Sequence, residues 1–268
     1  VLYEARMLAD AGVKELIVVA QDTSRYGTDL PGHKRLLPKL LHELCQIEGL
    51  HWIRVHYVYP DEIDDEFIQT MAQEPKIVKY LDIPIQHCND HILELMNRRG
   101  NGEFLRQLLK RLRDGIPGLV IRTSLITGLP GEGEAEFQEL CDFLRETRME
   151  RVGAFPFSPE EGTKAAAMEH VDADTAMERA QKIELLQSEI MDEYNASMIG
   201  KTLEVLVDGY DEEFEQFYGR TFADSPEIDG RVWIASPEPL HEGDFVMVTI
   251  DGVQDGDLAG YVSEEEEQ

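Results

Sequence analysis

The sequence predicts an α/β fold, in which a partial TIM-like barrel of parallel strands is followed by a small all-β barrel. Helical and strand-like patterns alternate through the first two-thirds of the 268 residues, which is typical of βαβ units and a parallel sheet. The strand-like runs there are almost entirely apolar, as expected for strands covered on both faces. Between residues 200 and 262 the pattern changes to short β-type runs separated by turn residues, typical of a small barrel of the oligonucleotide-binding type.

The first two-thirds begin with a helical pattern, in which Leu2, Ala5, Leu8 and Ala9 share one face until Gly12 ends the helix. The runs expected to form strands are Leu16–Ala20, Trp52–Val58, Tyr80–Ile85, Leu119–Thr127 and Arg151–Phe157. The helices expected between and after them are Leu36–Ile47, Asp61–Gln73, His91–Asn97, Glu103–Arg113, Glu134–Glu146 and a long one that Asp172 or Asp174 can cap and that runs to about Met198.

The first predicted element is a helix and residue 1 is not Met, so we expect a fragment with a strand and its following loop upstream. With that strand, the pattern gives six βα units, a partial (βα)6 barrel rather than a closed one. The predicted domains are residues 1–199 for the partial barrel and 200–262 for the β-barrel, with a disordered acidic tail at 263–268.

Composition narrows the class of protein. The sequence has no run of about 18 apolar residues and no signal peptide, so we expect no membrane span. The three cysteines lie far apart and indicate neither a zinc site nor a disulfide framework, which favours a reducing cytoplasm. With 25 basic against 54 acidic residues, the formal net charge is −29, which repels nucleic acid and suits a basic partner. Taken alone, the charge is better explained by solubility or adaptation to salt.

Polar and aromatic residues follow each predicted strand, where a barrel of this kind carries its functional groups. The fourth strand contains Arg122, its single charged residue, and leads into the turn Gly128–Glu132, with the sequence GLPGE. This turn is not a phosphate-binding P-loop, because no Lys followed by Ser or Thr comes after its last glycine. Taken alone, the turn is more often a plain connection, and Arg122 can equally form an interior salt bridge with Asp22 or Glu132.

Four ordered motifs resemble those of the radical S-adenosylmethionine methylthiotransferases: GVKELIVVAQDTSRYG, YLDIPIQHCNDHIL with LMNRR, RTSLITGLPGE and AFPFSPEEGTKAAAM. The closing β-rich segment resembles their TRAM domain, so the resemblance covers essentially the whole chain. It implies a radical SAM partial barrel, the cofactor S-adenosylmethionine and, in the parent protein, two [4Fe–4S] clusters. The branch that it looks most like adds a methylthio group to the β-carbon of an aspartate on the twelfth protein of the small ribosomal subunit.

The resemblance implies that S-adenosylmethionine lies along the strand ends, although it assigns no catalytic residue. Adenine needs an apolar slot, the methionine carboxylate needs a cation, and glycine lets the backbone approach the ligand closely. Each of these side chains can instead have a purely structural role, for example as a hydrogen-bonded loop histidine or as an aromatic residue of the core. The implied contacts are Arg122 for the carboxylate, Gln21, Asp22 and Thr23 for the amino group, Gln86 and His87 for the ribose, Leu125, Ile126, Phe155, Pro156 and Phe157 for adenine, and Ser124 and Gly128 in the same pocket.

The sequence departs from the family at one point, because it contains no C-x-x-x-C-x-x-C loop to hold a [4Fe–4S] cluster. Cysteine thiolates are the ligands of such clusters, so we expect this chain to bind neither of them. We therefore expect the fragment to be inactive while the parent protein is an enzyme, with the cluster cysteines upstream of residue 1.

The charge of the closing segment bears on the substrate. From Lys201 to the end there are three basic and nineteen acidic residues, a net of −16. Such a TRAM domain repels phosphate and attracts a basic protein, which favours the ribosomal protein over the transfer RNA adenosine that another branch modifies. Two further hypotheses are a non-catalytic acidic adaptor for a ribosomal protein and a partial-barrel enzyme with another nucleotide-like ligand.

Overall fold

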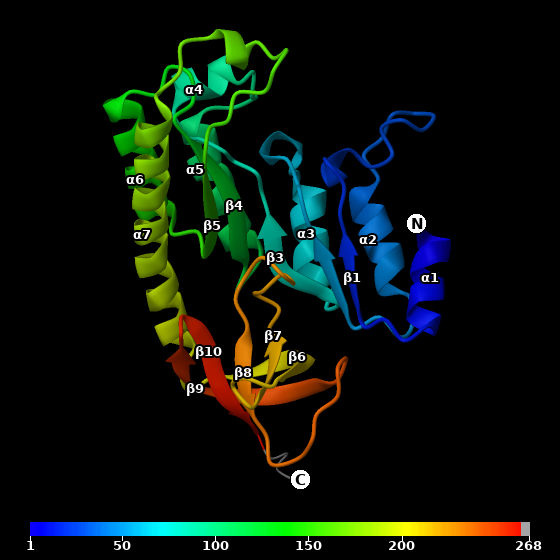
Figure 1. Cartoon of the computed structure of the whole chain (residues 1–268). Helices are drawn as coiled ribbons and strands as arrows, with labels where there is room; N and C mark the ends of the chain where they lie inside the picture. The colour runs from blue at the N-terminus through cyan, green and yellow to red at the C-terminus, as the bar shows by residue number, and fades with distance from the viewer. Residues whose placement is uncertain (264–268) are drawn as a thin grey trace. The chain divides into compact units, whose positions relative to one another are not determined.

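The computed structural model describes residues 1–263 and shows two compact units (Figure 1). One unit consists of Ile17–Gln46 and Ile53–Ile190 and holds most of the parallel sheet. The other consists of Val1–Leu16, Ile47–Trp52 and the described residues from Met191 on, and holds the small barrel. The domain boundary at residue 199 stays a prediction, and the expected disordered tail, apart from Ser263, lies outside the described residues.

Five parallel strands form one sheet in the order β1-β2-β3-β4-β5, which confirms the predicted α/β class. Each parallel pair needs a crossover, and helices provide it along one side of the sheet (Figure 1). The strands are β1 (Glu15–Val18), β2 (Trp52–Val55), β3 (Ile77–Asp82), β4 (Val120–Thr127) and β5 (Arg151–Pro156). The helices are α1 (Leu2–Asp10), α2 (Leu37–Cys45), α3 (Asp65–Gln73), α4 (Asp90–Leu95), α5 (Gly102–Gly115), α6 (Glu134–Thr147) and α7 (Ala173–Met198).

The middle of the sheet is the core of its unit. Ile53 pairs with Ile77 and Leu81 with Ile121, and none of these four side chains is more than 1% exposed. Burial of one such side chain contributes about 1.5–3 kcal/mol to the free energy of unfolding. The nearly continuous apolar runs of β2 and β3 are therefore explained by burial on both faces, whereas β4 alternates buried and half-buried residues.

Strand β3 begins three residues before the predicted Tyr80 and ends three residues before the predicted Ile85. Lys79 interrupts the apolar run, but its ammonium group donates to the carbonyl oxygens of Met71 and Glu74 at the end of α3. Pro84 has no N–H to donate, and pairing with β4 resumes only in an isolated bridge at Gln86.

The predicted helix Asp61–Gln73 is divided in two. A short 3₁₀ turn covers Pro60–Glu62, and α3 starts only at Asp65. The division occurs because Asp64 adopts an extended conformation and its carboxylate accepts the N–H of Phe67, as an N-cap residue does.

Backbone hydrogen bonds continue past the strands at their carboxyl ends. They connect the segment after β1 to the segment after β2, and so on across the sheet to the end of β5. The bonds run from Thr23 N to Tyr57 O (3.1 Å), Val58 N to Asp82 O (3.0 Å), Gln86 N to Ser124 O (2.9 Å) and Phe157 N to Thr127 O (2.7 Å). The five strand ends therefore form one continuous edge, as the sequence predicted.

The last five strands form a closed barrel in the order β10-β8-β7-β6-β9, which confirms the predicted small barrel. Val205, Val232, Ile234, Val248 and Ile250 fill its core and are at most 1% exposed. The strands are β6 (Thr202–Asp211), β7 (Gln216–Arg220), β8 (Val232–Ala235), β9 (Phe245–Gln254) and β10 (Asp257–Val262). Within residues 1–263, none of the helices has the length and apolar character that a membrane crossing requires.

Candidate functional site

The candidate site is an open face at the carboxyl ends of β4 and β5. Along β4, Arg122, Ser124 and Ile126 are half-buried, while the residues between them are buried on the opposite face. The register pairs Ile126 with Phe155 of β5, which is 53% exposed. The same face of β4 therefore carries a guanidinium group and, four residues further along, an apolar surface that solvent can reach.

The register of β3 and β4 determines the partner of Arg122. It places Asp82 opposite Arg122, and the guanidinium Nη1 lies 3.1 Å from the carboxylate Oδ1 of Asp82. The predicted partners were wrong, because Asp22 pairs with Arg25 and Glu132 pairs with an arginine of α7. The charge of Arg122 is thus offset by a carboxylate that is 2% exposed, although the guanidinium faces the open side of the sheet.

The turn after β4 is held by a fully buried carboxylate. Glu132 Oε1 accepts hydrogen bonds from the N–H of Gly128 (2.9 Å) and from Nη1 of Arg179 in α7 (2.8 Å), and Oε2 lies 3.5 Å from Nε2 of His87. Gly128 has a φ of +77°, and a Cβ added there would lie 2.3 Å from that of Ala176. Only glycine therefore fits this turn.

The environment of Glu132 favours its charged form. Burial alone raises the pKa of a carboxyl group, but the contacts with His87, the Gly128 N–H and Arg179 outweigh it and leave the pKa of Glu132 below its ordinary value of 4.5. The acidic residue of the GLPGE turn therefore points inward and anchors the turn, instead of facing a ligand.

The other predicted residues divide into two groups. Gln86, with a φ of +68°, and the half-buried Pro156 and Phe157 lie at the open edge. Thr23 and His87 are buried: the Thr23 hydroxyl donates to the carbonyl of residue 56, and Nδ1 of His87 accepts from the N–H of residue 89. The structure thus gives these two residues positions behind the open face.

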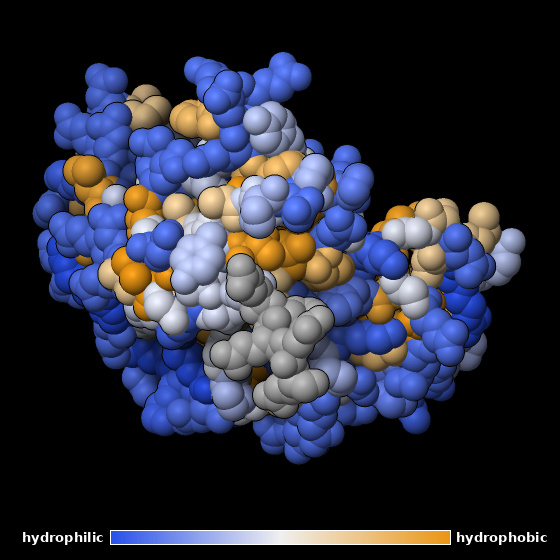
Figure 2. Space-filling model, turned by 90° about the horizontal axis from the view of Figure 1, so that it is seen from below, coloured by the Kyte–Doolittle hydropathy of each residue, from blue (hydrophilic) through white to orange (hydrophobic). Residues whose placement is uncertain are grey.

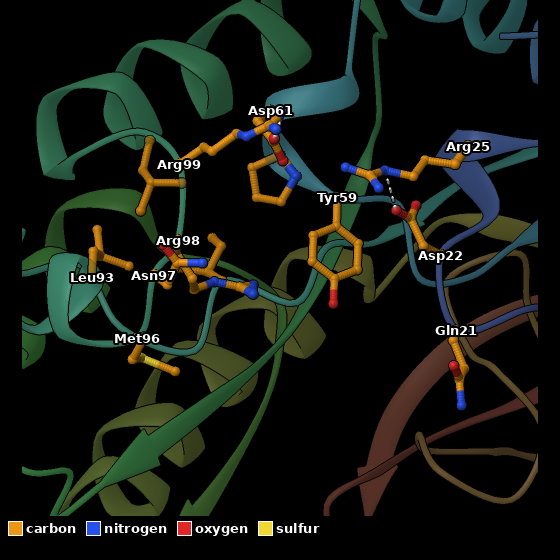
Figure 3. A pocket seen from close by; sticks show the side chains of 13 residues that line it. Gln21, Asp22, Arg25, Tyr59, Asp61, Leu93, Met96, Asn97, Arg98 and Arg99 are labelled. Atoms are coloured by element: carbon orange, nitrogen blue, oxygen red, sulfur yellow. Dashed lines mark ion pairs between the residues drawn. The ribbon is translucent and has the colours of Figure 1, made fainter. Parts of the chain in front are cut away.

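Gln21 and Asp22 line a cavity of about 510 Å³ at the same edge (Figure 3). The sequence did not predict its three arginines, Arg25, Arg98 and Arg99, because isolated arginines in loops look like ordinary solvated charges. The adjacent pair in the MNRRG stretch was the available signal. The cavity is lined by Gln21, Asp22, Arg25, Tyr59, Pro60, Asp61, Ile85, Leu93, Met96, Asn97, Arg98, Arg99 and Leu105.

Comparison with known proteins agrees with this architecture. The protein-family model of the radical SAM superfamily matches residues 1–144 of the sequence. The chain belongs to the radical SAM superfamily. The model of the TRAM domain matches residues 199–262, and both matches confirm the family resemblance seen in the motifs. Coproporphyrinogen III oxidase (HemN) from Escherichia coli, described as a radical SAM enzyme, shares the fold, with a TM-score of 0.51 and 16% identity over 70% of this chain and 46% of that chain.

This radical SAM chain is also similar to curated proteins named ribosomal protein uS12 methylthiotransferase RimO. The protein of Acetivibrio thermocellus is 47% identical over 266 residues, which are 99% of this chain and 58% of that protein. The protein of Anaeromyxobacter sp. is 47% identical over 264 residues, which are 98% of this chain and 56% of that protein. The chain thus spans less than two-thirds of the length of these relatives.

We predict that Glu132→Gln lowers the free energy of unfolding by about 3 kcal/mol, because it leaves the guanidinium of Arg179 buried without its carboxylate. Urea unfolding at pH 7 measures the loss. The matched control is Glu134→Gln, whose carboxylate lies 3.5 Å from the same guanidinium but is 76% exposed. The control should lose less than about 0.5 kcal/mol, and equal losses would contradict the assigned role of Glu132.

The same pair of proteins gives a pH readout. The folded-state pKa of Glu132 is depressed, so its contribution is complete above the ordinary pKa of 4.5 and is lost as the pH falls through the folded value. The difference in stability between wild type and Glu132→Gln should therefore shrink below about pH 4.5. A difference that stays constant down to pH 3 would argue against a charged Glu132.

Proposed function

We propose that this chain provides the S-adenosylmethionine-binding sheet and the TRAM domain of a radical SAM methylthiotransferase. The whole protein would insert sulfur at the β-carbon of an aspartate on ribosomal protein uS12 and transfer a methyl group to that sulfur. The proposed substrate places the reaction in the cytoplasm. The observation that carries the proposal is the 47% sequence identity to a RimO protein over 99% of this chain, together with strand ends that meet at one edge.

The open face suits an adenosyl amino acid. Ile126 and Phe155 offer an apolar surface for adenine, and the glycine turn at Gly128 allows close approach of the backbone. Gln86 would contact the ribose, and Gln21, Asp22 and Arg122 would offer polar groups to the amino-acid end, with Ser124, Pro156 and Phe157 along the same edge. S-adenosylmethionine, when bound, supplies the methyl group and the radical chemistry, while these side chains orient it and exclude water.

A [4Fe–4S] cluster does not fit the described residues. Within residues 1–263, no group of three or more His, Cys, Asp or Glu side chains could hold a metal ion. The three cysteines are buried separately, and burial raises the pKa of Cys45 to about 12 and that of Cys88 above its ordinary value. Any cluster of the whole protein would take its ligands from other residues, so we propose that this chain binds the cofactor without turnover.

The barrel unit supports a basic protein as the partner. The hairpin between β6 and β7 exposes Glu212, Glu213 and Glu215, and the carboxylate of Asp211 fixes this turn by accepting two backbone N–H groups. Phe214 at the tip is 46% exposed and is available to the aliphatic stem or the cation of a lysine or arginine. Most of the surface visible in Figure 2 is likewise hydrophilic.

Two of the three basic residues from 201 on, Arg220 and Arg231, offer little to an RNA backbone, whereas the third, Lys201, is exposed. Arg220 is buried between Asp208 and Glu15, with both ion-pair distances at 2.7 Å. Arg231 lies over the rings of Tyr218 and Trp233, at 4.9 and 5.2 Å from their centres. We therefore propose that the TRAM domain contacts the ribosomal protein and does not bind transfer RNA directly.

We predict that S-adenosylhomocysteine binds the chain in a calorimetric titration and that Phe155→Ala weakens binding about tenfold, because the adenine loses a stacking surface. Phe214→Ala, which removes a similarly exposed phenylalanine from the barrel, should leave the affinity unchanged. Failure of the wild-type chain to bind would refute the cofactor proposal and favour the non-catalytic adaptor.

We predict that replacing Glu212, Glu213 and Glu215 by Gln weakens binding of uS12 roughly tenfold at low salt, because the neutral side chains no longer attract its lysines and arginines. Fluorescence anisotropy with labelled uS12 measures the affinity. The matched control replaces three exposed glutamates of α7, Glu178, Glu184 and Glu189, and changes the net charge equally. Equal losses of affinity in the two variants would mean that only the net charge matters and not the hairpin. Preferential binding of transfer RNA would favour the other branch of the family.

A further inference from the structure

Gln21 and Asp22 line a cavity whose other lining residues have no role in the proposal so far. It lies between the loop after β1, the turn at Pro60–Glu62 and the loop from α4 to α5 (Figure 3). Ile85, Leu93 and Leu105 give it an apolar wall, whereas its rim carries three guanidinium and two carboxylate groups. Three guanidinium groups gather at this rim in a chain with a net charge of −29, and N–H donors that their ion pairs leave open favour an anionic ligand.

The loop that carries two of these arginines is tightly constrained. Asn97 and Gly100 have φ values of +55° and +91°, so the chain turns sharply on both sides of the arginine pair. The carboxylate of Asp90 accepts the N–H of Gly102 at 2.8 Å, and the side chain of Asn101 caps α5. A site on such a loop is preformed, which reduces the entropy cost of binding.

Arg98 forms a fixed part of the wall. Its Nη2 donates to the carbonyl oxygen of Pro84, and its guanidinium lies over the ring of Tyr59, 5.2 Å from the ring centre. Tyr59 stands in the middle of the cavity, with Arg98 on one side and Arg25 on the other (Figure 3). Arg98 is therefore engaged by the protein and serves to shape the site.

Arg99 and Arg25 are held more loosely, at the rim. Arg99 is 73% exposed, and its Nη1 lies 3.6 Å from Asp61 Oδ2 and 4.0 Å from Glu62 Oε1, both beyond hydrogen-bond distance. Arg25 is 55% exposed and lies 3.2 Å from Asp22 and 3.6 Å from the same Glu62 oxygen. Oε1 of the buried Glu62 thus lies near both guanidinium groups, while its Oε2 pairs with Arg35, and the pairs of Arg25 and Arg99 leave N–H donors for a ligand.

We propose that this cavity binds the carboxylate side chain of the aspartyl residue in the protein substrate, with Arg99 as the residue that determines specificity for a carboxylate. The guanidinium fork matches a carboxylate, and the apolar wall accommodates the carbon chain. Asp22 and Asp61 disfavour a doubly charged phosphate, and an adenine base has no negative charge for Arg99 to pair with. The proposal rests on the proposed function, because it requires the cofactor at the adjoining strand ends.

The test uses two small probes of nearly equal size, the N-acetyl, N-methylamide derivatives of aspartate, which carries a carboxylate, and of asparagine, which carries a neutral amide. Backbone amide shifts of residues 97–100 and 22–25 in NMR spectra of the chain report binding. The aspartyl probe should give saturable shifts, and the asparaginyl probe should bind at least about tenfold more weakly. Arg99→Gln should weaken the aspartyl probe about tenfold, and Arg99→Lys should lose less, because it keeps the charge but not the fork.

The matched control is Arg145→Gln on α6, which removes an arginine of 54% exposure that is also paired with an aspartate. This control should bind the aspartyl probe with wild-type affinity. Because Arg99 and Arg145 are both exposed, their replacement should not disturb the fold, and all variants should keep wild-type spectra outside the loop. The proposal is overturned if both probes bind equally, if Arg99→Gln binds like wild type, or if inorganic phosphate saturates the same amides more tightly. Binding of S-adenosylhomocysteine is measured separately, so loss of cofactor binding with retained aspartyl binding refutes the proposed function alone.

Discussion

The buried carboxylate of Glu132 is the interaction on which the arrangement of the strand ends depends. It joins the turn after β4, through Gly128, to His87 after β3 and to Arg179 of α7. Burying a charged carboxylate away from water costs free energy, and these contacts offset that cost. Because the carboxylate contacts three segments of the chain, it fixes the turn after β4 at the edge of the open face.

The parallel sheet determines where function can lie. Parallel strands bring their carboxyl ends to one edge, and the hydrogen bonds from Thr23 to Phe157 make this edge continuous. The edge carries two surfaces with different chemistry, namely the apolar face at Ile126 and Phe155 and the arginine-rich cavity around Tyr59. In our proposal these surfaces take the adenosyl group and the substrate carboxylate, while the acidic barrel attracts the rest of a basic protein.

Much of this architecture could be predicted from the sequence, because apolar runs and turn residues are local signals. The five parallel strands, the five-stranded barrel and the common edge of the strand ends follow from such patterns. The start of β3 was missed because Lys79 looks out of place in a buried strand until its ammonium group is seen on the carbonyls of α3. Local patterns cannot show that kind of tertiary contact.

Pairings between distant residues were harder to predict. Arg122 pairs with Asp82 because of the register of two strands, which the sequence of neither strand specifies. Arg179 lies 47 residues after Glu132, so its role depends on the packing of α7. Arg99 was missed because an exposed arginine in a loop looks like a solvated charge; its adjacency to Arg98 was a weak signal, and the cavity around it is what indicates a ligand.

Hydrogen–deuterium exchange of this chain with and without S-adenosylhomocysteine tests the central claim most directly. If one ligand lies along a single edge, exchange should slow together in the segments 21–23, 86–88, 122–132 and 153–157, with little change in residues 200–262. Protection of only one of these segments, or protection confined to the barrel, would contradict the claim that the strand ends form one cofactor site.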